Sequence, residues 1–161
     1  MTTVSSESVL RVQQALAAHG ITSPVVRLPA SARTAAEAAA ALGCALAQIA
    51  KSLLFGAGVA AEPILVIASG ANRVDELRLS QLLLLPVARV DAAFVRRHTG
   101  FAIGGVAPLG HPQPLRTFID ADLLRMAPIW AAAGTPYHVV ALTAAELVRA
   151  TGGAVAELAQ R

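Results

Sequence analysis

Residues 100–112 read Gly100-Phe101-Ala102-Ile103-Gly104-Gly105-Val106-Ala107-Pro108-Leu109-Gly110-His111-Pro112. Four glycines, two prolines and no charged side chain make this segment a poor helix and a poor central strand. Glycine lets backbone N–H groups approach an anion or a polarised carbonyl without a Cβ in the way, and proline fixes the direction in which the chain leaves. The segment therefore predicts a binding cradle around which the domain is arranged. The alternative is an ordinary tight loop between two strands.

A single lysine is the second unusual feature. Lysine and arginine together number 13, yet Lys51 is the only lysine. It lies in the apolar setting Gln48-Ile49-Ala50-Lys51-Ser52-Leu53-Leu54-Phe55. Because an ammonium on a thin stem enters a pocket too narrow for a planar guanidinium, we expect a functional position here. The alternative is a surface lysine at a strand edge, where charge discourages aggregation.

The composition is that of one compact domain spanning residues 1–161. Hydrophobic residues make up 55% of the chain and charged residues 14%. No apolar run approaches the ~18 residues that a membrane span needs, and the polar start, residues 1–7, lacks the order of a signal peptide. We therefore expect a cytoplasmic protein without a membrane partner.

The net charge and the cysteine content limit the kinds of partner and site that the chain can have. The net charge of +3 permits a polyanionic partner, whereas an aromatic content of 4% argues against a platform that stacks a long single strand. The single Cys44 excludes an internal disulfide and a cysteine-cluster metal site. In its alanine-rich surroundings it is expected to be a buried thiol and not a nucleophile.

Short helices and short strands are expected to alternate without a regular βαβ repeat. Helices are expected at about 8–19, 34–43, 45–49, 74–85, 91–97, 120–125 and 143–150, and strands at about 25–26, 53–55, 64–68, 87–90, 115–119, 129–131, 138–142 and 155–158. Thr34 and Thr143 each begin a capping box, Asp91 is an expected N-cap, and residues 74–85 are expected to turn Leu77, Leu82 and Leu85 inward. This order predicts an α/β (α+β) class with one mixed sheet.

The histidines are scattered, without the spacing of metal ligands. His111, at the end of the glycine-rich segment, is a candidate ligand contact or a loop histidine bonded to nearby backbone. His138 is expected to be structural or to form a pocket wall. Arg96, Arg97 and His98 are a candidate phosphate contact or a solvated helix end, where cations are favoured.

No motif for a catalytic serine, a phosphate-binding loop or a metalloprotease helix is present. A glycine-rich cradle with one lysine and no general base suits a substrate that is already reactive, such as an activated ester. Backbone donors aimed at a developing oxyanion contribute about 3–4 kcal/mol each. Cleavage of an amide or a phosphodiester would need further catalytic groups.

Four segments together resemble the YbaK-type aminoacyl-tRNA deacylases, which include the editing domain inserted in bacterial prolyl-tRNA synthetases and its free-standing relatives. The similarity runs from about residue 34 to residue 158, and its specific parts are residues 48–55, 66–74, 100–110 and 119–120. The resemblance implies a YbaK-like domain, with a mixed β-sheet or partial barrel surrounded by short helices, that removes wrongly attached amino acids from tRNA. It implies no cofactor and no metal.

The resemblance also assigns residues. Lys51 would be the family's essential lysine, which helps seat the terminal adenosine at the tRNA acceptor end. Gly104 and Pro108 would be the ends of a Gly-x-x-x-Pro loop whose backbone holds the aminoacyl carbonyl, while the ribose hydroxyl of the tRNA or the substrate's side chain supplies activation. The expected substrate-binding residues around them are Ser69, Gly70, Gly100, Gly105, Val106, Ala107, His111 and Asp120.

We therefore expect a trans-editing deacylase for mischarged tRNA, acting on tRNA for proline that carries a small wrong amino acid such as alanine, cysteine or serine. Residues 134–138 differ from the alanine-specific members, so the amino acid removed stays open, as does a prolyl-tRNA synthetase partner. One alternative is a noncatalytic module that binds an aminoacyl or nucleotide ligand. Another is a hydrolase of small free aminoacyl esters.

Overall fold

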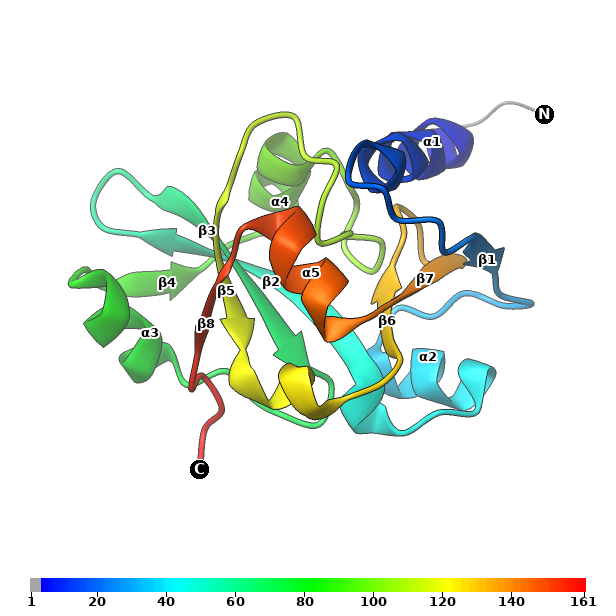
Figure 1. The fold of residues 1–161 in the computed structure, drawn as a ribbon. Helices are drawn as coiled ribbons and strands as arrows, with labels where there is room; N and C mark the ends of the chain where they lie inside the picture. The colour runs from blue at the N-terminus through cyan, green and yellow to red at the C-terminus, as the bar shows by residue number, and fades with distance from the viewer. Residues whose placement is uncertain (1–3) are drawn as a thin grey trace.

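The computed structural model describes residues 4–161, which form one mixed sheet with short helices packed against it (Figure 1). The α-helices are α1 (Val4–Ala18), α2 (Ala35–Leu42), α3 (Glu76–Leu83), α4 (Ala92–Thr99) and α5 (Ala144–Thr151), and the 3₁₀ helices are η1 (Leu46–Gln48) and η2 (Ala121–Arg125). The strands are β1 (Val25–Arg27), β2 (Ile49–Ala57), β3 (Glu62–Ser69), β4 (Val87–Arg89), β5 (Arg116–Asp120), β6 (Ile129–Ala132), β7 (His138–Leu142) and β8 (Ala154–Ala156).

The sheet runs in the order β1-β7-β6-β2-β3-β5-β8, and β4 pairs with β2 outside this path. Pairing is antiparallel for β1–β7, β6–β7, β2–β3 and β2–β4, and parallel for β2–β6, β3–β5 and β5–β8. The predicted mixed α/β domain is therefore confirmed. The long hairpin of β2 and β3 lies at the centre of the sheet (Figure 1).

Local capping signals set the helix ends as predicted. Thr34 and Thr143 both form complete capping boxes, and the Asp91 side chain accepts a hydrogen bond from the Phe94 N–H at the start of α4. Such caps satisfy backbone donors that the first helical turn leaves free. These signals involve residues three apart in the chain, which is why the sequence shows them.

The predicted inward face of α3 was wrong. The Asp75 side chain caps the helix, so that it begins at Glu76 and buries Leu79 and Leu83. Leu77 is 69% exposed, and Leu82 and Leu85 are also exposed. Because β2 begins at Ile49 and not at residue 53 as predicted, Lys51 lies inside this strand and not before it.

Three hydrophobic clusters fill the two faces of the sheet. The large cluster covers one face and includes residues of α1, β3, β7 and α5 together with Phe101, Val106, Ala107 and Leu109 of the glycine-rich segment. The opposite face carries two separate clusters. We call them the α2 cluster (Leu28, Ala32, Ala38, Ala39, Ile49, Val139) and the α3 cluster (Phe55, Ala57, Ile64, Val66, Ala68, Val74, Leu79, Leu83, Phe118, Leu158).

Within the described part of the chain, no helix has both the length and the apolar character that crossing a bilayer requires. The first residues of the polar start discussed above, 1–3, lie outside the described residues.

Candidate functional site

A cavity of about 470 Å³ opens beside a gap in the pairing of β2. On one edge β2 pairs with β3 from Ala50 to Ala57. On the other edge it pairs with β6 only at Ile49 and Ala50, and with β4 only from Phe55 to Ala57. Among residues 4–161 no strand covers this edge between the two, and residues 51–54 all line the cavity. The gap leaves backbone polar groups of β2 exposed to a ligand.

Lys51 lies between the α2 and α3 clusters. Side chains alternate along a strand, so Lys51 shares a face with Ile49 and Phe55. Ile49 belongs to the α2 cluster and Phe55 to the α3 cluster. The ammonium group therefore lies where the apolar covering of this face is interrupted.

The surroundings of Lys51 shift the pKa of its ammonium group. Burial lowers the pKa of its ammonium group, the Asp120 carboxylate raises it, and the positive charge of Arg73 lowers it. Desolvation disfavours the charged form, and an arginine nearby adds repulsion. A ligand that brings negative charge into the cavity would relieve both effects.

The first half of the glycine-rich segment forms the facing wall. Gly104 and Val106 line the cavity. Within residues 4–161 their N–H groups donate to no acceptor. Gly104 has a φ of 93°, a backbone conformation that other residues rarely adopt. The structure therefore brings Lys51, Gly104 and Val106 to one cavity.

Gly105 fixes this wall in place, although it does not itself line the cavity. Its carbonyl accepts a hydrogen bond from the Gly134 N–H at 3.1 Å. A Cβ on Gly105 would lie only 2.7 Å from Thr135 Cα. Glycine is required here because two backbone segments touch.

Gly100 and residues 107–112 lie outside the cavity lining. Pro108 and Ala107 are buried, and His111 Nε2 lies 2.8 Å from the Ala107 carbonyl oxygen. The imidazole N–H donates to this carbonyl, and the ring packs edge-on against Phe101 with its centroid 6.0 Å away. Gly100 accepts a 2.7 Å hydrogen bond from Arg11 Nη2 on α1. These residues hold the loop to the domain, and His111 is a loop histidine bonded to nearby backbone.

Ser69, Gly70 and Asp120 lie outside the lining as well. The buried Asp120 carboxylate accepts hydrogen bonds from the Ser69 N–H at 3.1 Å and from Asn72 Nδ2 at 2.8 Å. The Gly70 N–H donates to the Ile49 carbonyl at 2.7 Å. This network holds the end of β3 against the start of β2. Its link to the site is the charge that Asp120 exerts on Lys51.

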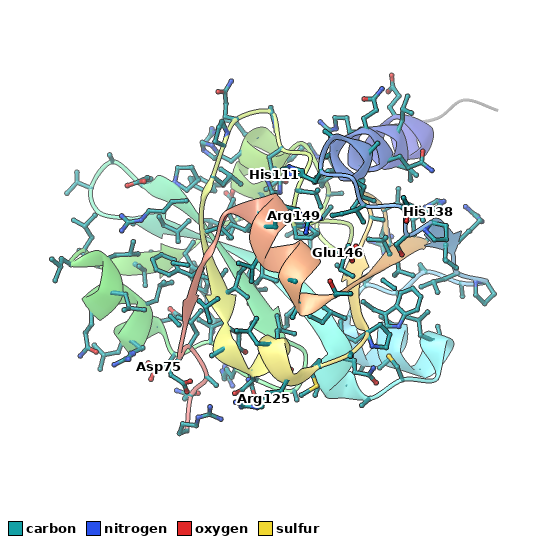
Figure 2. All side chains as sticks on the ribbon, viewed as in Figure 1. Asp75, His111, Arg125, His138, Glu146 and Arg149 are labelled. Carbon is teal, nitrogen blue, oxygen red and sulfur yellow. The ribbon has the colours of Figure 1, made fainter. Side chains whose placement is uncertain are left out.

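His138 lines the cavity from β7, as the prediction of a pocket wall required. Its Nδ1 lies 2.6 Å from Thr135 Oγ1, which also accepts a hydrogen bond from the Tyr137 N–H. The Thr135 hydroxyl proton can therefore go to Nδ1, which leaves the ring proton on Nε2. Burial and the charge of Arg27 lower the pKa of His138, so the neutral ring is favoured. Figure 2 shows His138 on β7 beside β1, away from His111.

Several lining residues were not predicted from the sequence. They are Arg33 before α2, Arg73 after β3, Arg89 on β4, and Trp130 on β6. Trp130 is the only tryptophan, which was a usable signal, whereas the arginines resemble the many others in the chain. Arg96, Arg97 and His98, a candidate phosphate contact, line no part of this cavity, although Val95 of the same helix does.

Cys44 is half-buried and follows the C-cap of α2 without lining the cavity. Burial raises the pKa of its thiol, which disfavours the reactive thiolate. Among residues 4–161 no three His, Cys, Asp or Glu side chains gather in a metal-binding arrangement.

The segments of this chain that match known proteins include the residues of both cavity walls. The family model of the aminoacyl-tRNA editing domain matches residues 29–150. The uncharacterized protein YwhH of Bacillus subtilis strain 168 is 31% identical over 123 residues, which are 76% of this chain and 78% of YwhH. A solved structure described as a candidate trans-editing enzyme for prolyl tRNA synthetase is 44% identical, with a TM-score of 0.89 over 96% of this chain and 98% of that one. A scaffold used for computational epitope grafting is 43% identical, with a TM-score of 0.91 over 97% and 99% of the two chains.

Proposed function

This chain belongs to the aminoacyl-tRNA editing domain family, and from that premise we propose that it is a trans-editing deacylase that hydrolyses the ester of mischarged tRNA. The observation that carries the proposal is one cavity that has Lys51 on one wall and, on the other, Gly104 and Val106, whose amides form no hydrogen bond within residues 4–161. The proposed substrate is tRNA for proline carrying alanine, cysteine or serine. Similarity to a candidate trans-editing enzyme for prolyl tRNA synthetase supports the choice of tRNA.

The proposed chemistry uses water and the lability of the ester. The Gly104 and Val106 amides donate to the aminoacyl carbonyl, whose oxygen gains negative charge as water attacks the carbon. Each such donor stabilises the transition state by about 3 kcal/mol. The C–O bond to the ribose then breaks, the ribose oxygen takes up a proton, and the free amino acid leaves. The neighbouring ribose hydroxyl assists the attacking water, so the protein need not supply a base.

Lys51 binds the terminal adenosine end in this scheme. Its ammonium group is held by the strand at a fixed place between two apolar clusters. A bound anion would restore the charged form that burial disfavours. Pro108 supports the reaction indirectly, because it is buried behind the cradle and fixes the path of the loop.

The size of the cavity supports a small aminoacyl group. About 470 Å³ lies in the lower part of the range for small-molecule sites, which is roughly 300–1,000 Å³. The terminal adenosine would fill much of that volume. Ile49, Trp130 and Val139 line the space as well and are difficult to displace because they pack with the α2 cluster.

The test is release of amino acid from tRNA for proline charged in turn with alanine, cysteine, serine and proline. Lys51→Ala should abolish release while the unfolding midpoint stays unchanged, and Lys51→Arg should not restore it, because the guanidinium is wider and planar. Turnover at the wild-type rate in Lys51→Ala would refute the role of this residue. Binding of every charged tRNA without release by the wild type would identify a noncatalytic module instead.

A further inference from the structure

Unpaired cations surround the mouth of the cavity. Four lysine and arginine side chains line it, Lys51, Arg33, Arg73 and Arg89, against one carboxylate, Glu76. Arg89 Nε lies 3.1 Å from Glu76 Oε2, so these two neutralise each other. Arg33 and Arg73 are exposed and form no ion pair with any of the described residues. Two guanidinium groups are therefore free to bind an anion.

Each free arginine lies beside one of the two proposed catalytic elements. A Cβ built on Gly104 would lie 3.5 Å from both Cα and Cγ of Arg33, so this arginine packs against the cradle. Arg73 follows the turn after β3 and is close enough to Lys51 for its charge to act on that ammonium group. The two arginines come from different elements, and they mark two separate points on the mouth.

This arrangement selects the charge of the ligand. A small free amino-acid ester has no phosphate for these cations to bind. A ligand with several phosphates is favoured, since the planar guanidinium matches phosphate with two parallel hydrogen bonds. In a nucleic acid such contacts fix the position of the strand without reading its sequence.

We propose that Arg33 and Arg73 bind backbone phosphates of the single-stranded acceptor end of the tRNA, and so position its ester between Lys51 and the cradle. The inference rests on the proposed function for the identity of the ligand, and it adds the residues that contact the phosphates. It also makes a small free ester a poor substrate.

The experiment measures binding of a fluorescent RNA that ends in CCA and carries alanine through a non-hydrolysable 3′ amide, over a series of salt concentrations. Arg33→Gln and Arg73→Gln should each weaken binding about fivefold at low salt, and each should reduce the slope of log affinity against log salt by about 0.7. Arg78→Gln is the matched control, because Arg78 is exposed on α3, forms no ion pair within residues 4–161 and does not line the cavity. Its affinity and slope should stay at the wild-type values.

Wild-type affinity and slope in both cavity variants would overturn the inference. A second readout uses 3′-alanyl adenosine, which has the ester but no backbone phosphates. Wild type, Arg33→Gln and Arg73→Gln should hydrolyse it at equal rates, and an equal loss on this substrate and on tRNA would also overturn the inference. Failure of the proposed function looks different: the wild type releases no amino acid from any substrate, yet the salt slopes still separate the two variants from the control.

Discussion

Two parts of residues 100–112 have opposite roles: the cradle part, residues 103–106, and the packed part, formed by Gly100, Phe101 and residues 107–111. Gly104 and Val106 line the cavity and keep free amides, whereas Ala107 and His111 use their polar groups on each other. The difference lies in the contacts, since Gly104 and Val106 line the cavity, whereas Phe101, Ala107 and Leu109 pack in the large cluster without lining it. A loop rich in glycine and proline can thus be part binding site and part scaffold. The two parts should respond differently to substitution.

Gly105→Ala should have the largest effect, because Gly105 holds the cradle against the loop at Gly134 and Thr135. The new Cβ would lie 2.7–2.9 Å from backbone atoms of Gly134 and Thr135, which cannot rotate away. Overpacking of this kind costs about 1–3 kcal/mol of unfolding free energy. Displacing the cradle should also lower deacylation at least tenfold. Urea unfolding and the deacylation assay measure the two losses, and wild-type values in both would contradict the close contact between the two loops.

Gly104→Ala and Gly100→Ala form a matched pair that separates the site from the scaffold. Both glycines have positive φ, 93° and 76°, so both substitutions strain the backbone by about 1–2 kcal/mol. Gly104→Ala should lower kcat/KM about tenfold, because it moves a donor of the cradle. Gly100→Ala would push the Arg11 guanidinium away from the Gly100 carbonyl and loosen α1, while kcat/KM stays within about twofold.

Because both variants should lose a similar amount of unfolding free energy, the informative comparison is between their kcat/KM values. Equal falls in kcat/KM for the two variants would mean that both parts serve the reaction through the fold alone. A fall confined to Gly100→Ala would contradict the assignment of the cradle to residues 103–106.

Much of the fold was predictable because short-range chemistry decides it. The capping boxes at Thr34 and Thr143 and the cap at Asp91 each use residues three apart, and all three helices begin where expected. The phase of α3 was not predictable from its pattern. Consecutive leucines at residues 82–85 have no period, so only the Asp75 cap and the packing partners decide which side is buried.

The site was partly predictable for a similar reason. Lys51 stands out as the only lysine, and residues 100–112 stand out by composition. Arg33 and Arg73 carry no such signal, because arginine is common in the chain and only the tertiary fold brings their segments to one mouth. His111 was a candidate because of its position in the loop. Its hydrogen bond to the Ala107 carbonyl depends on how the loop folds and could not be predicted from the sequence pattern.

The smallest effect concerns His111 in the packed part of the loop, and it appears only as a pH dependence of the unfolding free energy. Burial lowers the pKa of His111, the Ala107 carbonyl raises it, and the charge of Arg11 lowers it, with a net decrease. The unfolded chain, with a pKa of about 6.5, therefore takes up this proton at a higher pH than the folded chain does. The stability that the neutral ring contributes is fully present above about pH 6.5 and is lost as the pH falls through the lower folded value.

His111→Gln removes this titration, so the difference in unfolding free energy between wild type and variant should be constant above pH 7 and shrink below pH 6.5. The slope cannot exceed about 1.4 kcal/mol per pH unit, the value for one proton. His138, whose pKa is also lowered, is present in both proteins and cancels in the difference. Urea unfolding at pH 7.5, 6.5 and 5.5 measures it, and an equal difference at all three would show that His111 does not titrate with folding. Deacylation by the variant at pH 7.5 should match the wild type, because His111 and its contacts Ala107 and Phe101 do not line the cavity.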